Sequence, residues 1–139
     1  MTGIRESTIA VRVYYEDTDA GGIVYHANHL KYAERGRTEF LRELGVEQNQ
    51  LRRETGLGFA VAKLAIDYLA PAVLDDDLRV RTVVTAARRV SFDFLQTIER
   101  AGEILARMDV RVACIDARGR PARLPRDLAD AANAAHNAP

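Results

Sequence analysis

The chain has 139 residues, of which 47% are hydrophobic and 29% charged, and its formal net charge is zero. This length fits one ordinary domain, so residues 1–139 are expected to form a single domain. The composition is typical of a globular protein with a hydrophobic core, and the even charge balance argues against a nucleic-acid partner.

The sequence also bears on membrane insertion, secretion and cysteine chemistry. No apolar run approaches the roughly 18 residues that a membrane span needs, and residues 1–7 lack the apolar centre of a signal peptide. We therefore expect a cytoplasmic protein without a membrane span. Cys114 is the only cysteine, which excludes an intramolecular disulfide and a zinc site built on thiolates. Its alternating surroundings favour a buried apolar role.

The chain begins with a predicted strand at residues 8–15, where Ile9, Val11 and Val13 alternate with residues of the other face. Tyr14 and Tyr15 continue the alternation, so one of them is expected in the core. An acidic, glycine-bearing loop follows through Gly22.

The strongest helical pattern covers residues 28–44. Asn28 is a plausible N-cap and Gly45 a natural stop. The face that should pack inward carries residues at helical spacing: Leu30, Ala33, Arg37, Phe40, Leu41 and Leu44.

The remainder alternates between strands and turns, with tight turns expected at Ala101-Gly102 and Arg118-Gly119. A run of strands with one long amphipathic helix predicts the α+β class, with a curved antiparallel sheet around that helix. Such a layer leaves a sheet face or edge open, so a homo-oligomer is expected. Strands are predicted at 59–68, 78–85, 91–99 and 104–115, a short helix at 47–54, and a short, frayed helix after Pro125.

Three carboxylates, those of Glu16, Asp17 and Asp19, crowd the loop before the long helix. Asp and Gly are common in turns, so an ordinary polar turn is one interpretation. The other is a site, because the first N–H groups of a helix can bind an oxyanion or polarise a carbonyl. Gly21 and Gly22 would let a ligand approach the backbone. The residue types alone leave both interpretations open.

A metal centre built from His26, His29 and the two nearby aspartates is a further alternative. The spacing matches no strong zinc pattern, so no metal is expected. The chain also has no nucleophile elbow, P-loop or dinucleotide fingerprint.

The run from residue 11 to residue 44 resembles the signature of the 4-hydroxybenzoyl-CoA thioesterase family, and is most similar to the bacterial Tol-Pal-associated acyl-CoA thioesterases. Later segments match in the expected order, so the resemblance covers about residues 8 to 130. The matching segments are VYYEDTDAGGIVYHA at 13–27, YAER at 32–35, RTE at 37–39, YLAPA at 68–72, LDD at 74–76 and RLP at 123–125.

This resemblance implies a hotdog fold of about five strands around one long helix, assembled as a homodimer or homotetramer. It implies that Asp19 is catalytic, as nucleophile or as general base, while Asp17 is more suited to ordering the loop. The backbone N–H that polarises the thioester carbonyl corresponds to His26, whose side chain would assist. Val24 and Tyr25 would shape the approach.

Further substrate contacts follow from the same resemblance. Arg88, Arg89 and Ser91 stand where relatives contact CoA phosphates, although an ordinary solvated turn is the alternative. Glu34 matches an acidic residue that contacts the acyl group in aryl-specific relatives, or it pairs with Arg37. Coenzyme A is part of the substrate, so no separate cofactor is expected.

The predicted function is hydrolysis of an acyl-CoA thioester, with a short-chain or aromatic acyl group, to a free acid and CoA. A non-catalytic hotdog protein that binds acyl-CoA or acyl-carrier protein, or that scaffolds an envelope complex, is the alternative. A hotdog dehydratase fits poorly, because His29 with Glu34 is a weak substitute for its His and acid pair. The acyl specificity, the choice between dimer and tetramer, and the pathway stay open.

Overall fold

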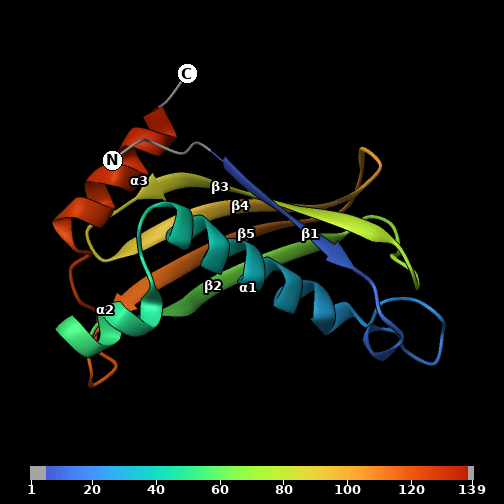
Figure 1. Ribbon diagram of the computed structural model, residues 1–139, viewed down its shortest axis with the longest axis horizontal. Helices are drawn as coiled ribbons and strands as arrows, with labels where there is room; N and C mark the ends of the chain where they lie inside the picture. Colours follow the sequence, from blue (N-terminus) through green and yellow to red (C-terminus); the bar gives the residue numbers. More distant parts are fainter. Residues whose placement is uncertain (1–5, 138–139) are drawn as a thin grey trace.

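Five antiparallel strands form one sheet in the order β1-β3-β4-β5-β2 in the computed structural model, which describes residues 6–137 (Figure 1). Every neighbouring pair is antiparallel. The sheet therefore has β1 and β2 at its two edges. The strands are β1 (Glu6–Arg12), β2 (Gly58–Tyr68), β3 (Asp77–Ala87), β4 (Ser91–Arg100) and β5 (Glu103–Ile115).

Helix α1 (His26–Glu43) lies across one face of this sheet (Figure 1). Its apolar face packs against the alternate strand residues that point toward it, as a two-residue strand period requires. This arrangement has the α+β architecture that the pattern predicted, and it is the hotdog fold that the resemblance implied. The buried residues of the two layers include Tyr32, Ala33, Phe40 and Leu41 of α1 and Leu78, Val80, Phe92, Phe94, Ile98, Met108 and Val110 of the sheet.

The middle of α1 lies very close to the sheet because residue 36 has no side chain. A Cβ built on Gly36 would stand 2.8 Å from Thr82 Oγ1. Beside this contact, buried Gln96 donates from Nε2 to Thr82 Oγ1 at 2.8 Å and to the Ala33 carbonyl at 2.9 Å. Arg37 donates to Gln96 Oε1 at 3.0 Å. The polar groups buried at this point therefore pair with one another and fix the helix on the strands.

The first strand is shorter than predicted, ending at Arg12 instead of residue 15. The Asp17 carboxylate accepts the Tyr14 N–H at 2.8 Å, and the chain turns into a short 3₁₀ helix, η1 (Tyr15–Asp17). The prediction that Tyr14 or Tyr15 is in the core is wrong, since both are exposed, at 60% and 81%.

Helix α1 begins at His26, two residues earlier than predicted, with Tyr25 as its N-cap residue. Asn28 is therefore not the N-cap; its side-chain amide donates to the Asp17 carbonyl at 2.8 Å. The predicted stop is confirmed, because Gly45 has a φ of 91° directly after the helix.

The other predicted helices and strands are present, with bounds that differ by at most two residues. Helix α2 (Gln48–Thr55) and the turn at Ala101-Gly102 are present, and both turn residues have positive φ. The predicted C-terminal helix is present as α3 (Arg126–Asn137), and Leu128, Ala131 and Ala132 are buried because this helix packs beside β3. Within residues 6–137, no helix has both the length and the apolarity to cross a membrane.

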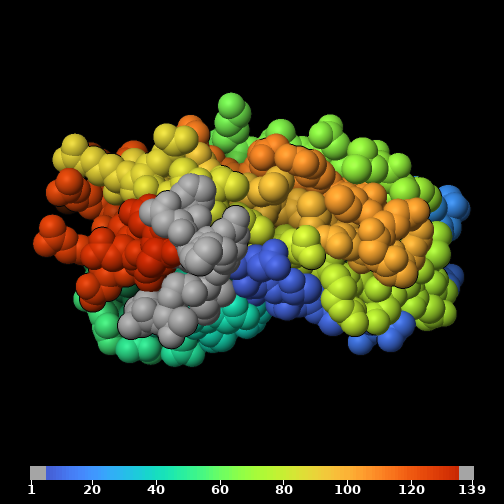
Figure 2. Space-filling view, turned by 90° about the horizontal axis from the view of Figure 1, so that it is seen from above, coloured from blue at the N-terminus to red at the C-terminus, as the bar shows by residue number. Residues whose placement is uncertain are grey.

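The loop that follows β1 and the turn between β3 and β4 lie at opposite ends of the molecule. Val13 N–H donates to the Asp76 carbonyl, so the loop joins the start of β3. At the other end, Leu124 N–H donates to the Arg89 carbonyl, which places the β3–β4 turn beside α3. Figure 2 shows red α3 at one end and the blue loop at the other. The strand between them accounts for roughly 30 Å.

Candidate active site

The loop before α1 folds into a tight turn around Asp19. Asp19 N–H donates to the Ile23 carbonyl at 2.9 Å, and Gly22 N–H donates to the Asp19 carbonyl at 3.0 Å. Gly22 has a φ of 84°, which a residue with a side chain rarely adopts. Gly21 N–H donates to Asp19 Oδ1 at 2.8 Å. One carboxylate oxygen is therefore held by the backbone, and the side chain has a fixed direction.

Asp17 ties the same loop together. Its carboxylate accepts the Tyr14 N–H at 2.8 Å. Its carbonyl accepts from Tyr25 N–H at 2.9 Å and from the Asn28 side chain at 2.8 Å. Asp17 thus joins η1 to the first turn of α1, as expected for a residue that orders the loop.

The start of α1 offers backbone donors. Val24 N–H and Tyr25 N–H already donate to the Ala72 and Asp17 carbonyls. The N–H groups of His26 and Ala27 have no acceptor among residues 6–137, as is usual in a first helical turn. These unpaired donors coincide with the positive end of the helix dipole, so they can stabilise negative charge on a ligand oxygen.

A cavity of about 430 Å³ joins the loop, the start of α1 and the end of β2. It brings together Asp19, Val24 and His26, three of the residues singled out from the sequence. Gly22 and Tyr25 are not in its lining; Gly22 forms the turn, and the exposed Tyr25 ring packs 4.5 Å from the His26 ring. The cavity is lined by Asp19, Ile23, Val24, His26, His29, Tyr68, Leu69, Ala70 and Pro71.

Two polar residues of this lining, His29 and Tyr68, were not predicted as site residues. His29 is only 3% exposed, and burial lowers the pKa of its imidazole. Its Nδ1 lies 3.2 Å from the His26 carbonyl, and its ring meets the Tyr68 ring edge-on at 5.2 Å. Two signals were available: His29 lies three residues after His26 on the same helical face, and Tyr68 opens the matched segment 68–72.

Glu34 lies outside this cavity. Its carboxylate pairs with Arg37, the second of the two alternatives that the sequence left open. Burial lowers the pKa of the Arg37 guanidinium, and Glu34 opposes that shift. Both residues line a small separate cleft with Phe59 and Val61.

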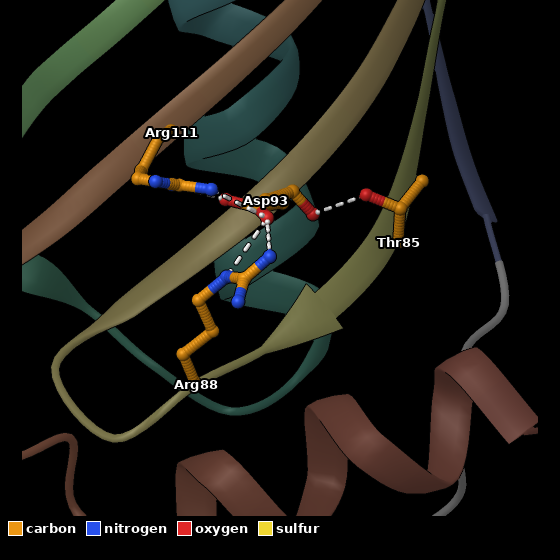
Figure 3. A network of polar contacts seen from close by, with 4 residues as sticks. All are labelled: Thr85, Arg88, Asp93 and Arg111. Carbon is orange, nitrogen blue, oxygen red and sulfur yellow. Dashed lines mark hydrogen bonds and ion pairs between the residues drawn. The ribbon is translucent and has the colours of Figure 1, made fainter.

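The other predicted substrate contacts, Arg88, Arg89 and Ser91, lie at the far end of the sheet, and Figure 3 shows Arg88 with its partner Asp93. Arg88 donates from Nε and Nη2 to Asp93 Oδ2 at 3.0 and 2.8 Å, and Arg111 donates to Asp93 Oδ1 at 2.8 Å. Arg111 and then Arg88 hold the pKa of the Asp93 carboxyl below its usual value. Ser91 is buried. Arg89 is exposed, and its guanidinium has no partner among the described residues. Arg88 and Arg89 therefore differ sharply in availability.

A metal centre at the acidic loop finds no support in the geometry. In the described part of the chain, the His, Cys, Asp and Glu side chains form no group of three suited to a metal ion. The polar groups of the cavity are instead one carboxylate, two imidazoles, one phenol and backbone donors. Such a set suits acyl chemistry, in which a carboxylate and an oxyanion-binding N–H act on one carbonyl.

Comparison with known proteins agrees with this geometry. Residues 13–132 match the model of the thioesterase-like superfamily. The chain is 46% identical over 119 residues to the acyl-CoA thioesterase YbgC of Haemophilus influenzae, covering 85% of this chain and 88% of that protein. It is 44% identical over 120 residues to the acyl-CoA thioester hydrolase YbgC of Escherichia coli O157:H7, covering 85% and 89%. A probable thioesterase from Bartonella henselae superposes with a TM-score of 0.83 at 35% identity, covering 86% and 99%. These matches confirm the resemblance that the sequence motifs indicated.

Proposed function

The chain belongs to the thioesterase-like superfamily and is a thioester hydrolase, and from this premise we propose that it cleaves an acyl-CoA thioester with Asp19 as the catalytic carboxylate. The observation that carries the proposal is that Asp19 and the start of α1 at His26 line one cavity. A thioesterase needs both an activated oxygen and a donor for the carbonyl, and the cavity has both.

The thioester carbonyl oxygen accepts a hydrogen bond from the His26 N–H. Negative charge develops on this oxygen as the tetrahedral intermediate forms, and a donor fixed by a helix needs no reorganisation to meet it. The positive end of α1 adds to the effect. Removal of one such donor typically slows turnover by about 10² to 10³-fold, so this N–H is a major part of the catalytic device. The exposed His26 side chain assists at the cavity mouth.

Asp19 supplies the carboxylate. Gly21 holds Oδ1, while Oδ2 has no partner among the described residues. As a nucleophile, Asp19 attacks the carbonyl carbon, the C–S bond breaks, CoA leaves as thiolate, and water then hydrolyses the mixed anhydride. As a general base, Asp19 takes a proton from a water that attacks the thioester directly. Both routes yield the free acid and CoA.

The cavity walls suit a compact acyl group. Ile23, Val24, Leu69 and Pro71 give the lining a largely apolar character. A volume of about 430 Å³ lies toward the small end of the range for ligand pockets. We therefore favour short-chain or aromatic acyl groups over long chains.

The CoA phosphates bind Arg89 of a second copy. Arg89 is the accessible guanidinium of the β3–β4 turn, because Arg88 is paired with Asp93. Within one chain, Asp19 and Arg89 are separated by roughly the 30 Å length of β3. A homodimer in which the turn of one copy lies beside the cavity of the other removes this separation. In this arrangement the expected homo-oligomer is needed for activity, because each site uses residues of two copies.

Thiol release from a panel of acyl-CoAs tests the proposal. Wild-type protein should release CoA from short or aromatic substrates, whereas Asp19→Asn should lose nearly all turnover and keep its fold. Asp17→Asn is the matched control: it keeps an oxygen that can accept the Tyr14 N–H, so it should retain much of the activity. Full activity in Asp19→Asn would sink the assignment. No thiol release from any acyl-CoA or acyl-carrier protein would favour the non-catalytic alternative.

Isotope labelling separates the two roles of Asp19. Single turnover in ¹⁸O-labelled water should leave label in the Asp19 carboxylate if it is the nucleophile. Label confined to the product acid would support a general base, and failure to trap an acyl-enzyme on Asp19 in the same experiment would then exclude the anhydride route.

Subunit mixing tests the position of Arg89. Asp19→Asn and Arg89→Glu proteins are unfolded, mixed and refolded, and turnover is measured at low acyl-CoA concentration. A site shared between copies predicts recovery to about a quarter of wild-type activity, since half of the dimers are hybrids with one intact site. No gain over the separate proteins would exclude a shared site.

A further inference from the structure

The carbonyl of His26 receives hydrogen bonds from two side chains. The Tyr68 hydroxyl donates to it at 2.8 Å, and His29 Nδ1 lies 3.2 Å from it. Tyr68 is the last residue of β2, an edge strand, and lies 42 positions away in sequence. The first turn of α1 is therefore attached both to the sheet and to its own second turn through a single oxygen.

The protonation states of both donors follow from their surroundings. A carbonyl only accepts hydrogen bonds, so the His29 Nδ1 must carry the proton. The neutral ring then has an unprotonated Nε2, which agrees with a buried Nε2 that has no partner in the described part of the chain. Burial lowers the pKa of His29 and raises the pKa of Tyr68. Near neutral pH, both groups therefore keep the proton that they donate.

Fixing this carbonyl also fixes backbone N–H groups. The peptide between His26 and Ala27 is planar, with its C=O and N–H pointing in opposite directions. When Tyr68 and His29 hold the oxygen, the Ala27 N–H is aimed away from them, out of the helix start. The His26 N–H is attached to the same Cα as the fixed carbonyl, so its direction is restricted too. Neither N–H has an acceptor among residues 6–137.

We propose that Tyr68 and His29 are positioning residues that aim the first N–H groups of α1 at the thioester carbonyl oxygen. The proposal rests on the proposed function, because it concerns the donor side of the same site. It assigns the Ala27 N–H as a second donor beside that of His26. A donor held in place acts mainly on the charged intermediate, so the two side chains affect kcat more than KM.

Steady-state kinetics with matched tyrosine variants test the first part. Tyr68→Phe keeps the ring and removes only the hydroxyl, and kcat should fall about 3- to 10-fold with little change in KM. Tyr15→Phe removes the hydroxyl of a ring that is 81% exposed, and its kinetics should match wild type. His29→Phe should show a smaller loss, because its hydrogen bond is longer. Unchanged kcat in Tyr68→Phe, or a change confined to KM, would overturn the proposal.

An infrared measurement tests the second part independently of turnover. Asp19→Asn protein, which should hydrolyse its substrate too slowly to deplete it during the measurement, is loaded with a thioester labelled with ¹³C at the carbonyl. The carbonyl stretch should lie below its frequency in water and should move part of the way back in Asp19→Asn/Tyr68→Phe. Equal frequencies in the two proteins would remove the positioning role while leaving Asp19 untouched. Rapid hydrolysis by Asp19→Asn would instead contradict the proposed function.

Discussion

Both ends of the sheet carry residues that the sequence predicts to be functional. They differ in whether their polar groups have hydrogen-bond partners. At the loop end, the N–H groups of His26 and Ala27 and the Nε2 of His29 lack partners within the described chain. At the turn end, Asp93 is bonded by both Arg88 and Arg111 (Figure 3). A paired charge contributes to the fold, whereas an unpaired donor beside a cavity is available to a ligand.

The contrast also separates neighbours. Arg88 and Arg89 are adjacent and chemically identical, but only Arg88 has an ion-pair partner among residues 6–137. Asp17 and Asp19 differ in the same way, since Asp19 lines the cavity and Asp17 binds the loop backbone. The resemblance already separates the two aspartates, whereas the two arginines are distinguished only by the ion pair that Arg88 forms.

The largest expected effect comes from making the same substitution at both ends. Asp19→Asn should reduce turnover by roughly 10³-fold or more with little change in stability. Asp93→Asn leaves two arginines with a weakened partner, so the free energy of unfolding should fall by about 1 kcal/mol, a modest value because both guanidiniums are half exposed. Chemical denaturation and thiol release would be measured for both. Equal loss of turnover in the two variants would break the division between the ends.

Gly36 lies in the middle of α1, between the two ends of the sheet. A substitution there tests how tightly the helix is held against the strands. A Cβ at residue 36 would lie 2.8 Å from Thr82 Oγ1 and 2.9 Å from Val80 Cγ1, and neither short side chain can move away easily. Gly36→Ala should therefore lower the free energy of unfolding by about 1–3 kcal/mol despite the better helix propensity of alanine. Gly58→Ala is the control, since its Cβ would meet nothing within 4 Å. Equal free energies of unfolding in the two variants would mean that α1 is not held this close to β3.

Substitutions of the neighbouring Arg88 and Arg89 should give a smaller effect, which is on KM. Arg89→Ala should raise KM for acyl-CoA about 10-fold, because it removes an accessible phosphate partner. Arg88→Ala should change KM less and reduce thermal stability slightly, because Arg88 bonds Asp93. Varying the salt concentration sharpens the test, since the KM of the variant that has lost a phosphate contact should depend less on salt than that of wild type. The reverse order of effects on KM would assign the phosphates to Arg88.

The smallest effect concerns pH. Burial lowers the pKa of His29 in the folded protein below its unperturbed value of 6.5. The unfolded chain therefore takes up this proton first, and the free energy of unfolding should fall as pH drops below about 6.5 and be insensitive to His29 above it. His29→Gln should flatten that part of the stability curve. Melting temperatures from pH 5 to pH 8 would show it, and an identical slope in both proteins would mean that His29 is not held neutral.

Most of the fold could be predicted from periodicity, because β3, β4 and β5 alternate and only one long helix carries a broad apolar face. The errors fall where tertiary contacts override local pattern. The alternation through Tyr14 and Tyr15 ended because Asp17 captured the Tyr14 N–H. The helix predicted in the alanine-rich tail is present, but its packing beside β3, which buries Leu128, could not be predicted from the local pattern.

The candidate site was predicted in part. The motif contained Asp19, Val24 and His26, which lie within one short segment and meet in one cavity. Tyr68 reaches the same cavity from an edge strand, and this approach is set by sheet order, which no local pattern encodes. Nor could a sequence distinguish Arg88 from Arg89, because the distinction lies in the partner that each one finds.

The attachment of α1 has a consequence for motion. Gln96 and Arg37 fix the middle of the helix on β4. Its first turn is held by the Tyr68 and His29 contacts with one carbonyl and by the contacts with Asp17. The helix should therefore open unevenly, with amides near Phe40 exchanging with solvent only on global unfolding and those near Leu30 exchanging through brief local fraying. The exchange rates of the first-turn amides would then report on the Tyr68 and His29 contacts separately from the stability of the core.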